Sequence, residues 1–170
     1  ALEAAITPKT KILVLPFPNN PTGAVMEKSD LEAIAEIIIK HDLFVLSDEI
    51  YSELSYMGDH VSIASFPGMK ERTILVNGFS KGFAMTGWRL GYACGPAEII
   101  AQMTKIHQYA IMCAPTNSQY AAVEALRNCR GEVAKMREAY NQRRRFLVHE
   151  LRRMGLECFE PYGAFYIFPS

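Results

Sequence analysis

The feature that most constrains the fold is a series of short apolar runs that alternate with segments of helical periodicity. The runs are KILVLPF, which begins at Lys11 and ends its apolar part at Pro16, and the segments 43–47, 73–77 and 89–94. Each run is continuously apolar rather than alternating, as is typical of strands buried on both faces. The sequence therefore predicts an α/β fold with a mostly parallel sheet that helices flank on both faces.

Helical segments separate and follow these runs. The first, SDLEAIAEIIIKH, places four apolar side chains on one face, and Ser29 with Glu32 three residues later predicts a capping box at its start. Further helices are expected at residues 97–110, 117–129 and 132–154. The tail LECFEPYGAFYIFP is predicted to form two strands around a Pro-Tyr-Gly turn.

Composition and charge exclude several functional classes. The 170 residues are 49% hydrophobic, which is enough for one substantial core. Lys plus Arg and Asp plus Glu number 18 each, so no general attraction to nucleic acid or to an anionic membrane is expected. Charges interrupt every apolar stretch well before the length of a bilayer span, and no signal peptide is recognised. The four scattered cysteines and four scattered histidines predict reduced thiols in a cytoplasmic protein and no metal site.

One loop carries two cations and no anion. In VNGFSKGFAMTGWR, Lys81 lies just after a predicted strand and eight residues before Arg89, with no Asp or Glu between them. Neither cation has a partner in the local sequence, and the loop lies beside the predicted core. We expect an anion that the chain does not encode to bind there.

Polar residues also follow the other predicted strands. The first strand leads into PFPNNPTG with Asn20, the second into SDEIY with Asp48 and Tyr51, and the third into the Lys81 loop. Ligands of open α/β sheets bind where the carboxyl ends of strands meet their loops. Taken singly, Asn20 suits a turn, Asp48 a helix cap, Tyr51 a core and Arg89 a surface. Their joint placement favours a ligand site.

These segments carry a family resemblance. NNPTG, SDEIY, FSKGFAMTGWRLGY and GAFYIFP together resemble the signature segments of class I/II, fold-type-I pyridoxal-phosphate aminotransferases, most closely the aspartate/aromatic branch. The resemblance extends over nearly the whole chain, and the ordered combination is far more specific than a lone NPTG. It implies transamination between an L-amino acid and a 2-oxo acid with pyridoxal 5'-phosphate as cofactor. It also implies a cytoplasmic homodimer that binds neither nucleic acid nor membrane.

The resemblance assigns roles residue by residue. Lys81 would form the Schiff base with the cofactor and shuttle the proton. Arg89 would bind the cofactor phosphate, which is the missing anion of the loop. Asp48 would face the pyridine nitrogen, and Asn20 and Tyr51 would hydrogen-bond the phenolic oxygen of the ring.

One position departs from the family pattern. Many relatives carry a phosphate-binding serine three residues before the lysine, where this chain has Gly78. The nearest hydroxyl is that of Ser80, and Asn77 and the Gly78 backbone are further candidate phosphate ligands. The resemblance also implies a cis bond between Asn20 and Pro21.

The resemblance further implies that the chain is the central part of a longer protein. The glycine-rich phosphate loop, the aromatic residue that stacks on the cofactor and a tyrosine from the dimer partner are expected upstream, and the arginine that binds the substrate carboxylate downstream. Residues 1–130 would then be a partial cofactor-binding domain. Residues 131–154 would form a connecting helix, and residues 155–170 would begin a small C-terminal domain.

Three alternatives to transamination remain open. A pyridoxal-phosphate C-S lyase of the same fold would share the cofactor motifs, because these do not fix the fate of the carbanion. A non-catalytic sensor domain of a transcription regulator would keep the cofactor site, and a basic helix-turn-helix segment upstream would favour it. A structural α/β domain would have no cofactor at all.

Overall fold

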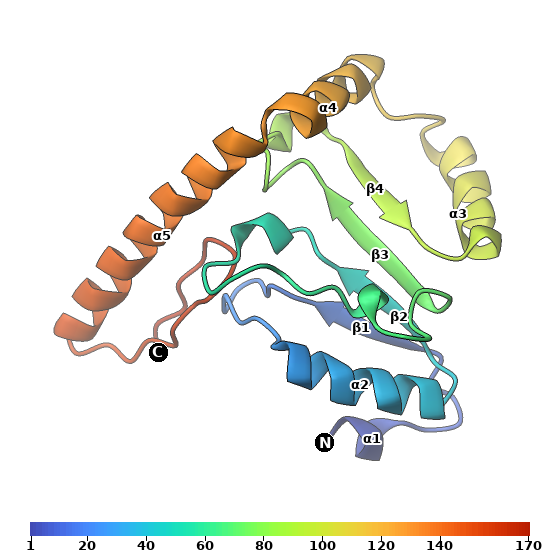
Figure 1. Cartoon of the computed structure of the whole chain (residues 1–170), viewed down its shortest axis with the longest axis horizontal. Helices are drawn as coiled ribbons and strands as arrows, with labels where there is room; N and C mark the ends of the chain where they lie inside the picture. Colours follow the sequence, from blue (N-terminus) through green and yellow to red (C-terminus); the bar gives the residue numbers. More distant parts are fainter.

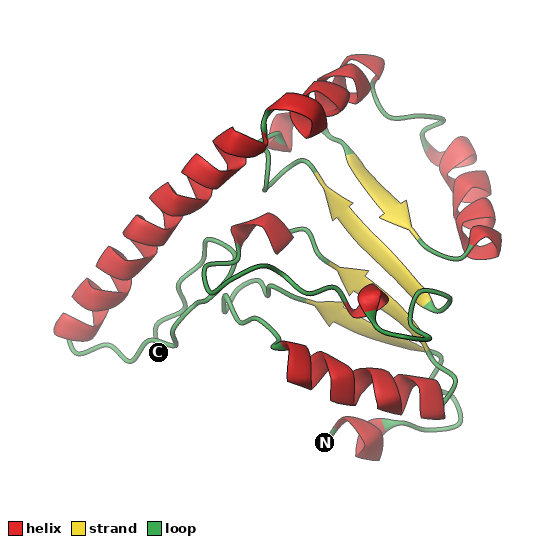
Figure 2. Cartoon of the chain, in the orientation of Figure 1, coloured by secondary structure: helices red, strands yellow, loops and turns green.

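The computed structural model describes residues 1–170 and contains one four-stranded sheet in the order β1-β2-β3-β4 (Figures 1 and 2). The strands are β1 (Ile12–Pro16), β2 (Phe44–Asp48), β3 (Thr73–Gly78) and β4 (Gly91–Cys94). The first three run parallel, and β4 runs antiparallel to β3. The predicted α/β fold with a mostly parallel sheet is confirmed, and each predicted strand is found with an end shifted by one or two residues.

The main core lies between the sheet and helix α2 (Lys28–Lys40). Strand side chains alternate between the two faces, so Leu15 and Val45 point into this core. Their neighbours Val14 and Phe44 point to the opposite face, where they are 53% and 40% exposed. The sequence predicts helices on both faces, whereas this chain covers only one face of β1 and β2.

The predicted cap of α2 is wrong. The helix begins at Lys28, so Ser29 and Glu32 already lie inside it. Glu27 is the N-cap in an extended conformation, and its side chain accepts a hydrogen bond from the backbone of Asp30 while the Asp30 carboxylate accepts one from the Glu27 backbone. A capping box therefore exists, but two carboxylates form it.

The C-terminal half of the chain is mostly helical. It contains α3 (Ala97–Ala110), α4 (Thr116–Asn128) and α5 (Arg130–Arg153), each within two residues of its predicted position. Helix α5 is the longest and leads away from the sheet along one side of the molecule (Figure 1).

The remaining helices are short. They are α1 (Leu2–Ala5), η1 (Ser52–Leu54), η2 (Ile63–Ser65) and η3 (Thr86–Trp88).

The tail after α5 does not form the two predicted strands. It contains only isolated bridges, one between Cys158 and Pro169 and one between Ser55 and Gly163. A two-stranded hairpin alone is marginally stable. The tail backbone instead bonds to the loop between β1 and α2, where the Gly163 amide donates a hydrogen bond to the Gly23 carbonyl at 2.8 Å.

None of the helices has the length and apolar character that crossing a bilayer requires. The structure also holds no cluster of three or more His, Cys, Asp or Glu side chains suited to a metal ion. The four cysteines are free thiols.

Candidate active site

The parallel register brings the ends of β1, β2 and β3 to one edge of the sheet. Pro16, the last residue of β1, lies opposite Asp48, the last residue of β2, and Asp48 lies opposite Val76 of β3. Asn20 follows β1 by four residues and Lys81 follows the end of β3 by three. The predicted set of strand-end residues therefore shares one edge.

The Lys81 loop is anchored by packing on both sides of the lysine. Phe79 and Met85 are buried in a cluster with Ala122 and Ala125 of α4. Within the loop, the Met85 amide donates to the Phe79 carbonyl at 3.0 Å. The backbone at Lys81 is thus held between two core residues, because both apolar anchors enter the same cluster.

Two aromatic rings lie beside the amine of Lys81. Its Nζ lies 5.9 Å from the centroid of the Tyr51 ring and 5.7 Å from that of Phe165. The two rings pack edge to face with their centroids 5.5 Å apart. Phe165 comes from the tail, so residues far apart in the sequence form one wall beside the lysine.

Tyr166 joins two of the predicted residues through its hydroxyl. The Asn20 Nδ2 donates to the Tyr166 oxygen at 3.3 Å, and the Tyr51 and Tyr166 oxygens lie 2.7 Å apart. Neither Phe165 nor Tyr166 is among the residues predicted to form the site. Both lie in the GAFYIFP segment, so a motif with no assigned role was the signal that could have found them.

Tyr51 is protonated at neutral pH. Burial raises the pKa of its hydroxyl, and the hydrogen bond with Tyr166 raises it further. A tyrosine in this state can donate a hydrogen bond to an anionic oxygen. The Asn20 amide lowers this pKa, and the negative charge of Asp48 raises it slightly, but burial and Tyr166 dominate.

Asp48 has no side-chain partner. Its Oδ1 accepts a hydrogen bond from the backbone amide of Ile50 at 3.2 Å, as a turn-capping residue does. The carboxylate is half-buried at the end of β2. Its remaining acceptor capacity is free for a donor on a ligand.

Close packing explains the glycine at position 78. A Cβ there would lie 3.1 Å from both the Gly91 Cα and the Leu90 oxygen. The Gly78 amide already donates to the Asn77 side chain at 2.7 Å. Ser80 uses its carbonyl to accept from Thr86, and its hydroxyl has no partner within the chain. The Asn77 side chain also donates to Ser52 at 3.1 Å, so Ser80 is the freest of the three candidate phosphate ligands.

The structure does not bring Arg89 into contact with the other predicted residues. Arg89 has a left-handed backbone, with φ at 53° and ψ at 52°, and its Nη1 donates to the Thr86 carbonyl at 2.8 Å. Its guanidinium is exposed and lines an open cavity of about 460 Å³ together with Asn117 and Ser118. An exposed guanidinium bonded only to its own loop has donors left for an anion.

The donor set fits the cofactor that the resemblance implies. No ion pair of the chain includes Lys81, Asp48 or Arg89. The free amine of Lys81 matches an aldehyde, and the free carboxylate of Asp48 matches a basic ring nitrogen. The neutral phenol of Tyr51, beside the Asn20 amide, matches a phenolic oxygen. The free guanidinium of Arg89 matches a phosphate. Pyridoxal phosphate carries these four groups.

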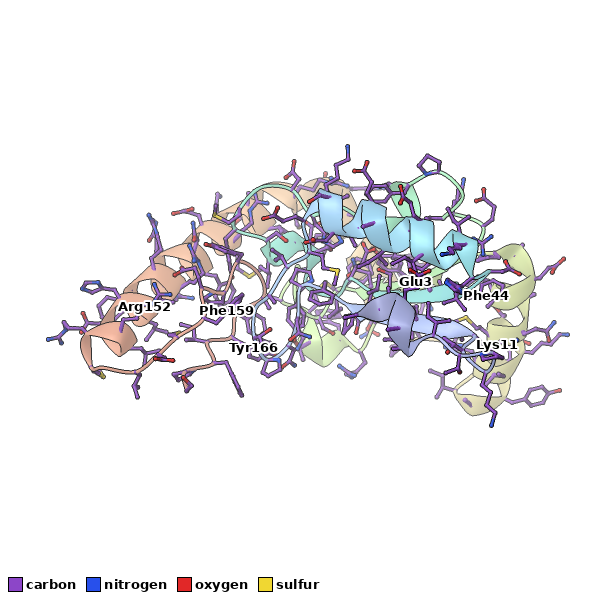
Figure 3. All side chains as sticks on the ribbon, turned by 90° about the horizontal axis from the view of Figure 1, so that it is seen from below. Glu3, Lys11, Phe44, Arg152, Phe159 and Tyr166 are labelled. Carbon is purple, nitrogen blue, oxygen red and sulfur yellow. The ribbon has the colours of Figure 1, made fainter.

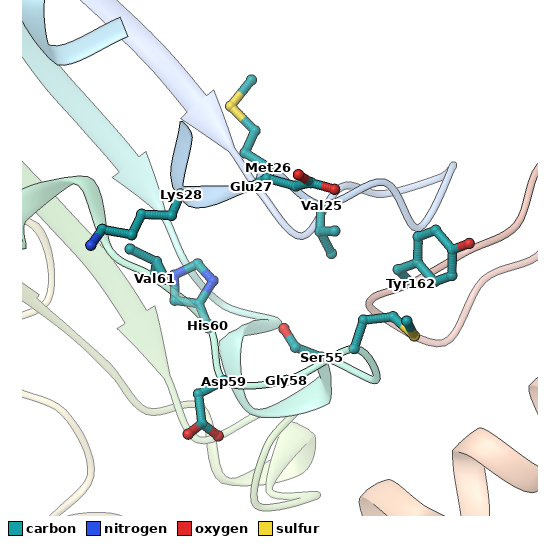
Figure 4. A pocket seen from close by; sticks show the side chains of 11 residues that line it. Val25, Met26, Glu27, Lys28, Ser55, Gly58, Asp59, His60, Val61 and Tyr162 are labelled. Atoms are coloured by element: carbon teal, nitrogen blue, oxygen red, sulfur yellow. The ribbon is translucent and has the colours of Figure 1, made fainter. Parts of the chain in front are cut away.

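A separate pocket of about 400 Å³ lies between the start of α2 and the segment that follows η1 (Figure 4). It is lined by the loop from Val25 to Lys28, by the segment from Met57 to Val61, and by Ser55 and Tyr162. None of the predicted site residues lines it. The pocket is therefore not the predicted site.

Beside that pocket lies a buried carboxylate, Glu49. It accepts hydrogen bonds from Ser47 at 2.9 Å and Ser62 at 2.6 Å, and the His60 Nε2 lies 2.9 Å from its second oxygen. Burial alone would raise the pKa of Glu49, but the contacts with His60 and Ser62 outweigh burial and lower it. Glu49 is thus a charged anchor inside the protein.

Solved structures share this fold closely. An aromatic aminotransferase from Pyrococcus horikoshii OT3 matches with a TM-score of 0.95 and 50% identity, over 99% of this chain and 46% of that one. An aspartate aminotransferase from Thermus thermophilus, solved with maleate, matches with a TM-score of 0.93 and 47% identity, over 98% of this chain and 44% of that one. The structure is therefore a pyridoxal-phosphate transferase fold of type I.

The family follows from the sequence comparison. The family model for aminotransferase class I and II matches residues 1–170, and the chain belongs to this family. It is 54% identical to the Bacillus subtilis protein YugH, described as an aminotransferase, and 51% identical to an aspartate aminotransferase of Pyrococcus abyssi. It is 50% identical to aromatic-amino-acid aminotransferase 2 of Thermococcus litoralis. Each match covers 99% of this chain but 44% of the relative, so the chain spans less than half their length.

Proposed function

We propose that the full-length protein transfers an amino group between an L-amino acid of the aspartate or aromatic type and a 2-oxo acid. The observation that carries this proposal is Lys81, an amine without an ion pair that a packed loop holds beside two aromatic rings at the ligand edge of the sheet. Relatives named as aspartate and as aromatic aminotransferases support the substrate class. The maleate in the Thermus thermophilus structure also suits a site for dicarboxylates.

Lys81 would hold the cofactor covalently and move the proton. Pyridoxal phosphate supplies a carbonyl for the amine and a ring that accepts electrons from the substrate Cα. When it is not bonded to the cofactor, the Lys81 Nζ would be a free base that could accept the substrate Cα proton and donate it again. Only a lysine can perform both tasks.

The other residues would orient the cofactor and tune its charge. Asp48 would keep a proton on the ring nitrogen, with an attraction of roughly 5 kcal/mol at ~3 Å before desolvation is subtracted. Asn20 and Tyr51 would donate to the phenolic oxygen. Arg89 would bind the phosphate through its fork of donors, with Ser80 as a second donor.

The remaining assignments rest on the resemblance. We propose a cytoplasmic homodimer, in which residues 1–130 belong to the cofactor-binding domain and residues 131–154 connect it to a small domain that begins at residue 155. The substrate carboxylate would bind to an arginine outside these residues.

Covalent labelling of Lys81 by the cofactor tests this proposal. Full-length protein is reduced with borohydride in the presence of pyridoxal phosphate, and the modified peptide is mapped by mass spectrometry. We expect the adduct on Lys81, and we expect Lys81→Ala to lose both the adduct and amino transfer to 2-oxoglutarate. Lys105→Ala is the matched control, because Lys105 is exposed on α3.

Two outcomes would contradict the proposal. An adduct on another lysine would remove the assignment of Lys81. Release of pyruvate and a thiol from a β-thio amino acid, in place of amino transfer, would show a lyase.

A further inference from the structure

Tyr166 links two segments that lie far apart in the sequence. Its hydroxyl accepts from Asn20 in the loop after β1 and lies 2.7 Å from the hydroxyl of Tyr51 after β2. Figure 3 shows Tyr166 between the end of the α5 arm, marked by Arg152, and the far end of the sheet, marked by Phe44. One tail residue thus bridges the two side chains that were predicted to bind the same oxygen of the cofactor.

The hydrogen bond between Asn20 and Tyr166 has a fixed direction. An amide nitrogen only donates, so the Tyr166 oxygen accepts from the Asn20 Nδ2. Either hydroxyl can donate across the 2.7 Å contact between Tyr51 and Tyr166. When an anionic ligand oxygen accepts the Tyr51 hydrogen, the Tyr166 hydrogen is available for the Tyr51 oxygen. In this arrangement, Tyr51 presents a donor that is already oriented.

Packing holds the Tyr166 ring independently of its hydroxyl. The ring lies 4.9 Å from Phe165 and 5.7 Å from Tyr51, measured between centroids. It packs against a core cluster that contains Tyr51, Leu54 and Ala164, of which the last two are fully buried. Removal of the Tyr166 oxygen alone should therefore leave the ring in place.

We propose that Tyr166 is a positioning residue that orients Tyr51 and Asn20 toward the phenolic oxygen of the bound cofactor. This inference rests on the proposed function. Without the Tyr166 oxygen, the Tyr51 hydroxyl and the Asn20 amide lose their shared partner and turn more freely. Their donation to an anionic oxygen weakens, so that oxygen becomes more basic.

The experiment uses full-length Tyr166→Phe and measures the absorbance spectrum of the bound cofactor as a function of pH. We expect the midpoint of the spectral change to rise by about 0.5 to 1 pH unit, because a more basic phenolic oxygen holds the neighbouring proton more tightly. Titration of the apoprotein with pyridoxal phosphate should show roughly two- to tenfold weaker binding. Tyr162→Phe is the matched control, since it removes a tail hydroxyl that no hydrogen bond uses.

A double variant separates positioning from direct contact. If Tyr166 acts through Tyr51, Tyr51→Phe should raise the midpoint more than Tyr166→Phe, and the double variant should raise it little beyond Tyr51→Phe alone. An unchanged midpoint in Tyr166→Phe, with a shifted one in Tyr51→Phe, would overturn the role of Tyr166 and leave the proposed function standing. Fully additive shifts would overturn positioning in favour of independent contact. Absence of cofactor binding in the wild type would overturn both proposals.

Discussion

Asp48 and Glu49 are consecutive carboxylates with opposite surroundings. Asp48 accepts a single backbone hydrogen bond, whereas Glu49 is buried among Ser47, Ser62 and His60. Successive strand residues point to opposite sides, so the end of β2 can direct one carboxylate to the ligand edge and the other into the protein. The buried anchor and the functional group therefore share one stretch of backbone.

The first residue-scale prediction concerns the charge of Asp48. Asp48→Asn keeps the shape and removes the charge, so the full-length variant should bind pyridoxal phosphate but react at least about a hundredfold more slowly, since each 1.36 kcal/mol lost is tenfold. The rate is measured in a single turnover with excess enzyme. Asp59→Asn, at an exposed position, is the control. An unchanged rate for Asp48→Asn would show that Asp48 only caps the turn at Ile50.

The second concerns the pH dependence of stability at Glu49. Its pKa in the folded protein is below the ordinary value of 4.5, so its contribution is fully present above about pH 4.5 and is lost as the pH falls through the folded pKa. Glu49→Gln should therefore lower the free energy of unfolding at pH 7 by about 1 to 3 kcal/mol, and by less at pH 4. Urea unfolding at both pH values measures this, with the exposed Glu32→Gln as control. An equal loss at both pH values would mean that the charge of Glu49 is unimportant.

The candidate site shows what local sequence can and cannot reveal at the level of residues. Asn20, Asp48 and Lys81 were predictable, because parallel strands place their following residues at one edge whatever the details of packing. Tyr166 was not, because it contacts Asn20 across 146 residues of sequence and follows no strand of the sheet. Such a contact depends on how the tail docks, and no local pattern encodes that.

At the scale of elements, the helices after β4 were predicted within two residues, because Pro96 precedes α3 and Gly155, with φ at 85°, follows α5. The tail strands were predicted wrongly. Alternating apolar residues favour an extended backbone, but a strand also needs a second strand with which to form a ladder of hydrogen bonds. In the tail, the Gly163 backbone instead bonds to Gly23 in a distant loop. Pairing between distant segments is a tertiary property that propensity does not fix.

The docking of the tail leads to a prediction at Gly163. A Cβ at this position would lie 2.5 Å from the Cβ of Pro18 and 2.9 Å from Cγ1 of Val25. Gly163→Ala should therefore destabilise the protein by about 1 to 3 kcal/mol, and it should weaken cofactor binding because Phe165 and Tyr166 follow directly. Thermal unfolding and cofactor titration measure the two effects.

Gly131 offers the matched control for this substitution. It lies in α5, and a Cβ there meets nothing within 4 Å. Gly131→Ala should stabilise the protein by up to about 1 kcal/mol through helix propensity. A Gly163→Ala variant as stable as the wild type would show that the tail can shift without cost.

At the scale of the whole molecule, large apolar surfaces lie open. Ile12 and Val14 are each 53% exposed on the uncovered face of the sheet, and Tyr109 of α3 is 95% exposed. No residue of α3 is buried. Sheets of parallel strands are normally covered on both faces, and contiguous exposed apolar patches mark interaction surfaces. Because the chain spans 44% of the length of its relatives, further chain of the same protein is the natural cover for these surfaces.

The last prediction is that residues 1–170 alone do not catalyse transamination, even if every assignment is correct. Lys81, Asp48 and Tyr51 would form one wall of the site, and the arginine proposed to bind the substrate carboxylate would lie outside residues 1–170. Orientation contributes roughly 7 to 11 kcal/mol to reactions between bound groups, and a cofactor held on one side loses much of it. The uncovered face of the sheet should also make the isolated chain associate.

The test compares residues 1–170 with the full-length protein. Both are assayed with pyridoxal phosphate, aspartate or phenylalanine, and 2-oxoglutarate, and their masses in solution are measured by light scattering. We expect turnover only from the full-length protein, and concentration-dependent association of the shorter chain. Replacing Ile12 and Val14 by threonine should reduce this association if the sheet face drives it, whereas threonine at the buried Leu15 should not. Comparable turnover by residues 1–170 would mean that a complete site lies within them. A shorter chain that stays monomeric would mean that the exposed sheet face is an ordinary surface of the protein.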